Sequence, residues 1–505
     1  MKLERGIKNI IFSFSTQIIT IALGLIVPRL ILVNYGSEIN GFFSTVSNIY
    51  TYLSVLEAGV GTAAIQALYG PVVRNNRDEI NGILSATRKL YRRCAKMYLI
   101  AVGVLSLVLP FTLNTTINSA TIIGYVFLQG LITVINFYML STLSVLLSAE
   151  GKNYIKSNIA LLSTILTNIA KIILVNAKVN IVFLQVAYLS ISLIVLGIYL
   201  LYFKKNYKWI NLNVAPRASN IKQQKYYLIH QISFIVFNNI DTVIISIFCG
   251  LSMASVYAIY NMVFSYVGTL FNTVFISLNF TLGQTYNEDK SRYPRFHDAY
   301  KTYFCAVLFA LVSVCYLLII PFIQMYTAGI SDVVYIDKYL PFLFCMIQLL
   351  SGSRSQEADL INIDRKAKET MWRTIAEAGI NLILSLILVQ FWGLYGVLIA
   401  TIVAMLYRTN DILFYANRII LKRWPVQAYK IVFVDFSVFF GVVWIKRFIN
   451  IPINNYYEFF FWGIILTLIA VVVYVVINSM ISYTSFCYIR EAIIPRVAGK
   501  FKRGV

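Results

Sequence analysis

The chain is apolar almost from end to end, in windows that are each long enough to cross a lipid bilayer. A transmembrane helix needs about 20 mostly apolar residues, and fourteen such windows follow one another here, separated by short charged segments. Because 59% of the 505 residues are hydrophobic and only 13% are charged, a soluble fold could not bury this much apolar surface. The sequence therefore predicts an all-α polytopic membrane protein with about fourteen transmembrane helices, at residues 10–33, 41–69, 97–113, 122–147, 158–175, 179–203, 228–249, 254–282, 303–326, 339–360, 374–391, 394–416, 431–449 and 457–477.

Lysine and arginine residues concentrate on one side of these predicted helices. The formal net charge is +22, which in a soluble protein would indicate nucleic-acid binding. If the N-terminus is cytoplasmic, 35 of the 43 basic residues fall in the inner segments and only four in the outer loops. Because cytoplasmic loops are enriched in Lys and Arg, this distribution predicts that both termini are cytoplasmic. We therefore expect anionic membrane lipids, and no nucleic acid, as partners of the positive charge.

The two halves of the chain resemble each other. The stretch "LVNYGSEINGFF" (32–43) aligns with "SIFCGLSMASVY" (246–257), and "LVLPF" ending at Phe111 aligns with "LIIPF" ending at Phe322, at offsets of 214 and 211 residues. A same-sense repeat of six helices predicts two lobes around a central cavity, with a site between them near the membrane midplane. The expected organisation is an N-terminal lobe (1–203), a basic cytoplasmic linker (204–227), a C-terminal lobe (228–423), two additional transmembrane helices (424–489) and a basic cytoplasmic tail (490–505).

The sequence contains no arrangement of residues that is typical of an enzyme. The six cysteines and the histidines His230 and His297 lack metal-binding spacing. No phosphate-binding loop of the nucleotide-hydrolysing type occurs, and the short outer loops contain no paired acid and base for hydrolysis or glycosyl transfer. We therefore expect no enzymatic activity, no metal site and no cofactor.

Polar side chains recur at helical spacing on the first two predicted helices of each half. Lipid cannot form hydrogen bonds with such side chains, so they should face protein or a water-filled cavity. Contacts between helices through small and polar residues are the alternative explanation. The four polar stripes include Ser13, Gln17 and Thr20; Tyr50, Ser54 and Glu57; Gln231, Asn238 and Asp241; and Tyr257, Asn261 and Ser265.

Asp241 places a carboxylate in the middle of the predicted helix 228–249. A charge at this depth costs about 2.5 to 3.5 kcal/mol on insertion scales, so the carboxylate is paired, protonated or in contact with water. Three roles fit: an ion or proton coupling site, a partner for a buried cation, or a hydrogen bond to Asn238 one turn away. Glu57 lies nearer the cytoplasmic end of its helix, where interfacial solvation is an alternative. Asp241, Asn238 and Glu57 are the candidates for coupling or gating.

Two arginines inside predicted helices have a carboxylate three residues further along the chain. Arg354 precedes Glu357, and Arg408 precedes Asp411. This spacing permits an ion pair within one helix. A structural salt bridge and a functional role in substrate binding are both consistent with it.

Two further cations inside predicted helices have no such neighbour. Lys171 has no carboxylate within one turn, so it must find a partner on another helix or face an aqueous cavity, where it would attract an anion. Arg29 lies near the outer end of its helix and can extend to the interface. The candidate substrate-binding residues are Lys171, Arg354, Arg408, Arg29, Asn261 and Asn48.

Four stretches of the sequence resemble a known family. They are "PRLILVNYGSEINGFFS" from Pro28, "LEAGVGTAA" from Leu56, "SAEGKNYIKSNIALLS" from Ser148 and "NNIDTVIISIFCGLSMASVYAIYN" from Asn238. The chain is similar over almost its whole length to the polysaccharide flippases for O-antigen and capsule units, within the multidrug, oligosaccharidyl-lipid and polysaccharide exporter (MOP) superfamily. The resemblance implies two six-helix lobes around a central cavity, two further helices, and alternating access between inward-open and outward-open states.

The resemblance also implies a substrate and a place of action. The substrate would be a polyprenyl-pyrophosphate-linked oligosaccharide, moved across the bacterial cytoplasmic membrane for the synthesis of a surface polysaccharide. A proton or sodium ion and the polysaccharide polymerase machinery are further candidate partners. An ion-coupled multidrug or cation antiporter of the same superfamily is the alternative, and its cavity should be net acidic. An integral-membrane glycan polymerase or ligase would need a large outer loop with catalytic groups, which the sequence lacks.

Overall fold

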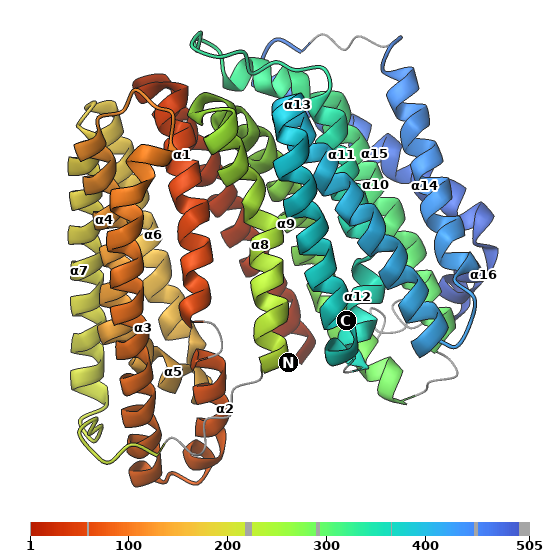
Figure 1. The fold of residues 1–505 in the computed structure, drawn as a ribbon. Coiled ribbons are helices and arrows are strands. Elements are labelled where there is room, and N and C mark those ends of the chain that lie inside the picture. The colour runs from red at the N-terminus through yellow and green to blue at the C-terminus, as the bar shows by residue number, and fades with distance from the viewer. Residues whose placement is uncertain are drawn as a thin grey trace. The chain divides into compact units, whose positions relative to one another are not determined.

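The computed structural model describes residues 2–57, 60–217, 225–288, 293–364, 366–448 and 453–493 (Figure 1). In these residues the regular elements are all helices. The predicted tail beyond residue 493, residues 218–224 of the predicted linker, and the side chains of Ser13, Gln17, His230 and Gln231 lie outside the described part. The α-helices are α1 (Lys2–Leu53), α2 (Val60–Val73), α3 (Arg77–Thr112), α4 (Ser119–Ile135), α5 (Ser141–Ala149), α6 (Asn153–Asn176), α7 (Ile181–Asn206), α8 (Lys225–Phe248), α9 (Leu251–Glu288), α10 (Tyr293–Tyr326), α11 (Leu340–Ser353), α12 (Ser355–Ile363), α13 (Ala367–Tyr415), α14 (Val426–Ile445), α15 (Tyr456–Ile481) and α16 (Tyr483–Tyr488).

Each of the fourteen predicted membrane spans coincides with one or more of these helices. Nine helices within the described ranges are long and apolar enough to cross a membrane. The helices α1 and α13 each run through the boundary between two predicted spans. Near that boundary the backbone is non-helical, at Gly36 in α1 and at Gly393 in α13. The prediction of an all-helical, multi-pass membrane protein is confirmed.

Turns recur in the two halves of the chain at the predicted offset. Gly36 and Gly250, 214 positions apart, both have positive φ angles, of 84° and 87°. Glycine reaches this region without the steric penalty of a Cβ atom. The turn after α5 is closed by a hydrogen bond from the N–H of Lys152 to the carbonyl of Leu147 (2.8 Å). The same bond, from Lys366 to Ile361 (3.0 Å), recurs 214 positions later. These turns support an internal repeat of about this length.

A helix break also recurs in both halves. A π-helix, η2 (Asn136–Leu140), separates α4 from α5, and the N–H of Ser141 donates to the carbonyl of Asn136 five residues back. About 213 positions later, α11 ends at Ser353 and α12 begins at Ser355. A break inside an apolar helix frees backbone groups that need other hydrogen-bond partners. Such breaks are therefore places where side chains from other helices can act.

The chain forms two compact units. The first, here called the N-terminal unit, is Leu23–Ser255, and the second, the C-terminal unit, combines Met1–Ala22 with Val256–Val505. The division into lobes 1–203 and 228–423 stays a prediction.

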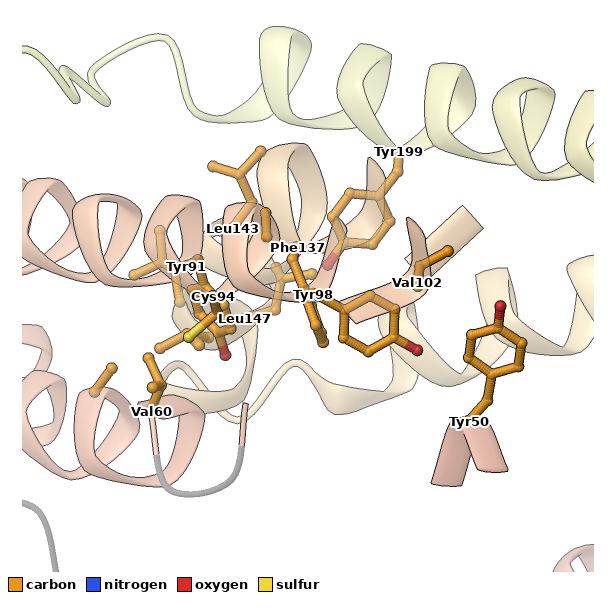
Figure 2. Packing of buried hydrophobic residues seen from close by; sticks show 14 of the residues in the cluster. Tyr50, Val60, Tyr91, Cys94, Tyr98, Val102, Phe137, Leu143, Leu147 and Tyr199 are labelled. Carbon is orange, nitrogen blue, oxygen red and sulfur yellow. The ribbon is translucent and has the colours of Figure 1, made fainter. Parts of the chain in front are cut away.

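The core of the N-terminal unit is rich in tyrosine (Figure 2). The rings of Tyr98 and Phe137 pack edge to face with 5.4 Å between centroids, and the hydroxyl of buried Tyr50 donates to the carbonyl of Val126 (2.5 Å). A buried tyrosine hydroxyl needs such an acceptor. The tyrosines therefore tie α1 and α3 to the α4–η2 segment through both packing and hydrogen bonds.

In the C-terminal unit, α10 is the central helix and packs against α11, α14 and α15. Phe309 on α10 contacts Phe436 on α14 edge to face, with ring centroids 5.0 Å apart. The hydroxyls of Ser313 on α10 and Tyr474 on α15 lie 2.8 Å apart. The two helices that follow the predicted C-terminal lobe are thus packed directly on its central helix.

Candidate functional site

Three arginines and two carboxylates form a continuous chain of ion pairs in the C-terminal unit. Arg354 Nη1 lies 2.5 Å from Glu377 Oε1, and Arg408 Nε lies 3.5 Å from Glu377 Oε2. Arg408 Nη1 also lies 2.5 Å from Asp411 Oδ2, and Arg373 pairs with the other oxygen of Asp411. We call these five residues the arginine cluster. It contains one more positive charge than negative charge.

The break at Gly393 explains how this cluster forms. Since α13 reverses direction there, its two halves lie side by side, and Asn381 Nδ2 donates to Thr401 Oγ1 between them (2.7 Å). About two turns nearer the ends of the hairpin, Arg408 Nη2 donates to Thr374 Oγ1 (3.0 Å). The hairpin therefore brings basic and acidic residues from its two halves together.

Burial changes along the cluster. The side chains of Glu377 and Arg408 are each 7% exposed, whereas that of Arg373 is 38% exposed. Charged side chains inside membrane proteins are rare, are usually paired, and mark functional sites. Guanidinium groups bind phosphate with two parallel hydrogen bonds. The cluster thus offers an anion a partly accessible entry at Arg373 and buried donors further inside.

The structure confirms one predicted ion pair and corrects the other. Arg408 pairs with Asp411 at the predicted spacing of three residues. Arg354 does not pair with Glu357, because Glu357 points to Lys301 on α10, 2.5 Å away. Arg354 instead reaches the first half of α13. The structure thereby brings two predicted substrate-binding residues, Arg354 and Arg408, to one shared carboxylate.

The sequence reasoning missed Glu377, Arg373 and Lys301. Glu377 lies inside the predicted span 374–391, so an isolated carboxylate in an apolar window was an available signal. Arg373 and Lys301 lie just outside predicted spans, where basic residues are expected in cytoplasmic loops. Their pairing depends on helix packing that spacing along the chain does not show.

Lys171, on α6 of the N-terminal unit, has an aromatic partner. Its Nζ lies 5.1 Å from the centroid of the Tyr188 ring on α7. Among the residues that the structure describes, it forms no ion pair. A cation–π contact stabilises the ammonium but leaves its positive charge uncompensated. Lys171 is therefore a second place where an anion would be stabilised.

Asp241 is buried on α8 of the same unit. Asp241 interacts electrostatically with Tyr52 on α1, and the hydroxyl of Tyr52 donates to the carbonyl of Val236 on α8 (3.3 Å). Asn238 is exposed on the same helix. Glu57, in the short helix η1 (Ser54–Glu57), accepts a hydrogen bond from the hydroxyl of Tyr91 (3.0 Å). The coupling or gating roles of Asp241, Asn238 and Glu57 stay hypotheses.

The other candidate residues lie at separate positions. Asn48 Nδ2 donates to the carbonyl of Ser44 one turn back in α1 (2.9 Å). Arg29 is half-buried on α1 in the N-terminal unit, and Asn261 is half-buried on α9 in the C-terminal unit. Their roles in substrate binding stay predictions.

Apolar helices long enough to cross a bilayer, with charged side chains held among them, define the architecture of a multi-pass membrane protein. Solved structures identify that architecture more narrowly. The chain is similar to the lipid II flippase MurJ in its inward closed conformation, with a TM-score of 0.64, 16% sequence identity, and coverage of 93% of this chain and 99% of that chain.

Two multidrug transporters share the architecture. One is a multidrug resistance MATE family transporter of the MOP superfamily in its inward-facing conformation (TM-score 0.59, 14% identity, covering 83% of this chain and 94% of that chain). The other is the MATE multidrug transporter DinF-BH in complex with R6G (TM-score 0.56, 16% identity, 81% and 96%). No protein-family model and no curated protein matches the sequence. The chain therefore has the fold of the MOP-superfamily transporters.

Proposed function

We propose that this protein is a flippase that translocates polyprenyl-pyrophosphate-linked oligosaccharides across the bacterial cytoplasmic membrane by alternating access, for the synthesis of a surface polysaccharide such as O-antigen or capsule. The observation that carries the proposal is the excess positive charge of the arginine cluster. A pyrophosphate headgroup is the anionic part of such a substrate. Arginine suits it because the planar guanidinium matches phosphate oxygens in pairs.

The ion pairs of the cluster explain how it could bind and release an anion. Glu377 and Asp411 neutralise two of the three guanidinium groups and hold them in place while no substrate is bound. A phosphate group would replace carboxylate oxygens as the acceptor of hydrogen bonds from these guanidinium groups. The partly exposed Arg373 would meet the anion first. The carboxylates remain nearby and can form ion pairs with the arginines again after the anion leaves, so binding stays reversible.

Lys171 adds a second cationic contact. Its neighbour Tyr188 is neutral, so the ammonium charge is available to an anion without the cost of breaking an ion pair. The lipid tail of the substrate need not leave the bilayer while the headgroup and glycan cross. Asp241 is the first candidate for coupling this cycle to a proton or sodium ion.

An ion-coupled multidrug or cation antiporter is the second candidate, because two of the solved structures with this fold are multidrug transporters. A site for organic cations should carry an excess of carboxylates, whereas the arginine cluster carries an excess of arginines. The charge balance therefore favours an anionic substrate.

Proteoliposomes distinguish the two functions. The purified full-length protein would be reconstituted and tested with a polyprenyl-pyrophosphate-linked oligosaccharide and, in parallel, with a cationic dye under an inward or outward proton gradient. We expect the glycolipid to be translocated and the dye to equilibrate no faster than in protein-free liposomes. Gradient-driven dye transport without glycolipid translocation would refute the flippase and support the antiporter.

A further inference from the structure

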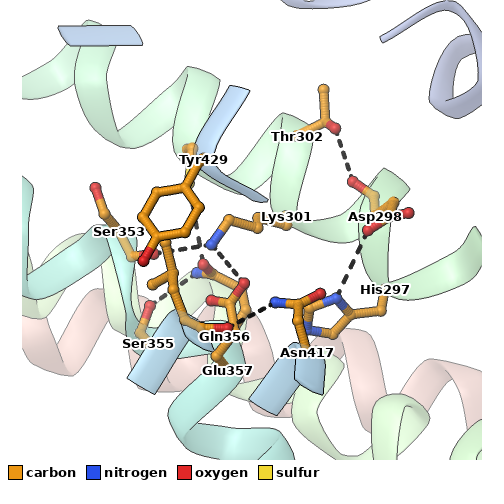
Figure 3. A network of polar contacts seen from close by, with 12 residues as sticks. His297, Asp298, Lys301, Thr302, Ser353, Ser355, Gln356, Glu357, Asn417 and Tyr429 are labelled. Carbon is orange, nitrogen blue, oxygen red and sulfur yellow. Dashed lines mark hydrogen bonds and ion pairs between the residues drawn. The ribbon is translucent and has the colours of Figure 1, made fainter. Parts of the chain in front are cut away.

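A second group of buried charges lies in the C-terminal unit, where α14 and α15 pack on α10. These two helices follow the predicted C-terminal lobe and are here called the appended helices. The Nζ atom of Lys301 on α10 lies 2.5 Å from Glu357 Oε1 on α12, and both side chains are 0% exposed (Figure 3). Asp435 on α14 is also fully buried, and the charge of Lys301 acts on its carboxylate. We call Lys301, Glu357 and Asp435 the buried triad.

Each carboxylate of the triad has one oxygen without a hydrogen-bond partner in the described part of the chain. Asp435 Oδ1 accepts from Asn478 Nδ2 on α15 (2.6 Å), while its Oδ2 has no partner. Glu357 Oε1 accepts from Lys301, while its Oε2 has no partner. An uncompensated buried polar group costs free energy, and a buried charge costs more.

The charges of the buried triad do not balance when both of its carboxylates are ionised. One ammonium and two ionised carboxylates would leave one negative charge buried inside the membrane protein. Among the described residues, four other ionisable groups interact electrostatically with Asp435 or Glu357. They are Cys305 and Tyr293 on α10, Tyr474 on α15 and Tyr429 on α14, and because they are normally neutral they do not balance this charge. The triad therefore needs one further positive charge.

We propose that the buried triad is a proton-binding site. In the protonated state, a hydronium ion has given its proton to Asp435 Oδ2, a new O–H bond is formed, and water is released. The remaining carboxylate then balances Lys301. A proton fits better than a metal ion, because the described residues hold no group of three or more His, Cys, Asp or Glu side chains that could ligate one. This site is distinct from Asp241, which belongs to the N-terminal unit.

The position of Lys301 connects this proton to the arginine cluster. Its Nζ also donates to the carbonyl of Ser353 (3.0 Å), the last residue of α11 at the helix break. Arg354 of the arginine cluster follows immediately, and Glu357 lies three residues further along. The ammonium of Lys301 thus contacts both the break between α11 and α12 and Glu357 on α12. Protonation of Asp435 would leave Glu357 as the carboxylate that balances Lys301 and would strengthen that ion pair, so the proton changes how firmly Arg354 is positioned.

This link would give the two appended helices a role in the cycle. They supply Asp435 and Asn478, and so they control how strongly the triad holds its proton. That part of the inference rests on the proposed function, because it assumes that the arginine cluster binds the anionic headgroup. The existence of the proton site does not depend on that assumption.

Infrared spectroscopy tests the proton site alone. The full-length protein in lipid nanodiscs would be measured across a pH series, and we expect the C=O stretch of a buried protonated carboxyl group. This band should be lost or shifted in Asp435→Asn, which is close in shape to the native side chain and leaves the Lys301–Glu357 pair intact. Glu369→Gln, at an exposed carboxylate, should leave it unchanged. No such band in the wild type, or an unchanged band in Asp435→Asn eluting as a folded monodisperse protein, would overturn the proposal.

Binding of inorganic pyrophosphate tests the link. The Kd for pyrophosphate would be measured by calorimetry at two pH values, one on either side of the infrared transition. Between these pH values the Kd of the wild type should change about fivefold or more, and it should change by more than the Kd of Asp435→Asn. Comparing the two proteins removes the ionisation of pyrophosphate itself. An equal change in both would overturn the link. Failure of both proteins to bind pyrophosphate would contradict the proposed function, while the infrared result would still decide the proton site.

Discussion

Arg354 and Arg408 hold the two oxygens of one carboxylate, that of Glu377. Arg354 Nη1 lies 2.5 Å from Oε1, and Arg408 Nε lies 3.5 Å from Oε2. Arg354 lies at the break between α11 and α12, whereas Glu377 and Arg408 lie in the first and second halves of α13. This carboxylate therefore fixes the relative positions of three parts of the C-terminal unit. It also keeps two positive charges close together at a buried place. Both consequences can be measured.

Glu377→Gln should destabilise the protein strongly. The amide cannot balance two guanidinium groups, and removing one partner of a buried ion pair costs about 3 to 5 kcal/mol. Glu369→Gln is the matched control, because Glu369 is 50% exposed and pairs with Lys366, which directly precedes the same helix. The thermal unfolding midpoint in detergent should fall clearly in the first variant and remain near the wild-type value in the second. Equal midpoints in the two variants would show that Glu377 has no special structural role.

Alanine at either repeated turn should also destabilise the fold. Gly36 and Gly250 have φ angles of 84° and 87°, and a residue with a Cβ atom held in such a sparsely populated conformation costs about 1 to 3 kcal/mol. Gly379→Ala is the control, since no heavy atom lies within 4 Å of a Cβ at this helical position. We expect Gly36→Ala and Gly250→Ala to unfold at lower denaturant concentration than the wild type. Gly379→Ala should unfold at the same or a higher concentration.

Gly41 permits close contact between α1 and the start of α9 within the N-terminal unit. A Cβ at this position would overlap the carbonyl oxygen of Leu251, and nearby Asn40 Nδ2 donates to Ser255 Oγ (2.7 Å). The double variant Asn40→Cys/Ser255→Cys, with Cys249 replaced by Ala, should therefore form a disulfide under mild oxidation.

Adding Gly41→Leu to this double variant should reduce the yield of the disulfide, because the larger side chain must push the two helices apart. Gly103→Leu is the control, since a Cβ at Gly103 meets no atom within 4 Å. Mass spectrometry of the digested protein would quantify the cross-link. Undiminished cross-linking with leucine at position 41 would mean that the helices do not meet as closely as described.

The helices were predictable from the sequence because length and apolarity decide whether a segment can span a membrane. The ion pair between Arg408 and Asp411 was predictable for a similar reason, since a spacing of three residues places both on one helix face. The positions of glycines also helped. Gly393 falls between two predicted spans, where the structure shows the reversal of α13.

The pairing of Lys301 with Glu357 could not be predicted in the same way. Lys301 lies near the start of α10 among other charged residues, a position typical of a cytoplasmic loop, yet it is fully buried. Its burial depends on the packing of α10 against other helices, and its Nζ contacts Ser353 at the end of α11 and Glu357 on α12. Glu357 turns towards it, and Arg354 is left to pair with Glu377. Packing between helices that are distant in the sequence determines these partners. The spacing of residues within one helix gives no information about that packing.

Translocation of a polyprenyl-pyrophosphate-linked oligosaccharide by proteoliposomes, compared between wild type, Lys171→Gln and Asp241→Asn, tests the proposed flippase most directly. Lys171→Gln removes a charge without leaving an ion-pair partner behind, and Tyr188→Phe is its control because the cation–π contact survives. Losing a charge-assisted contact of about 1.5 to 3 kcal/mol should slow translocation about tenfold or more. We predict transport by the wild type and Tyr188→Phe, and its collapse in Lys171→Gln and Asp241→Asn. Wild-type rates in both Lys171→Gln and Asp241→Asn, when folded and correctly inserted, would contradict the account.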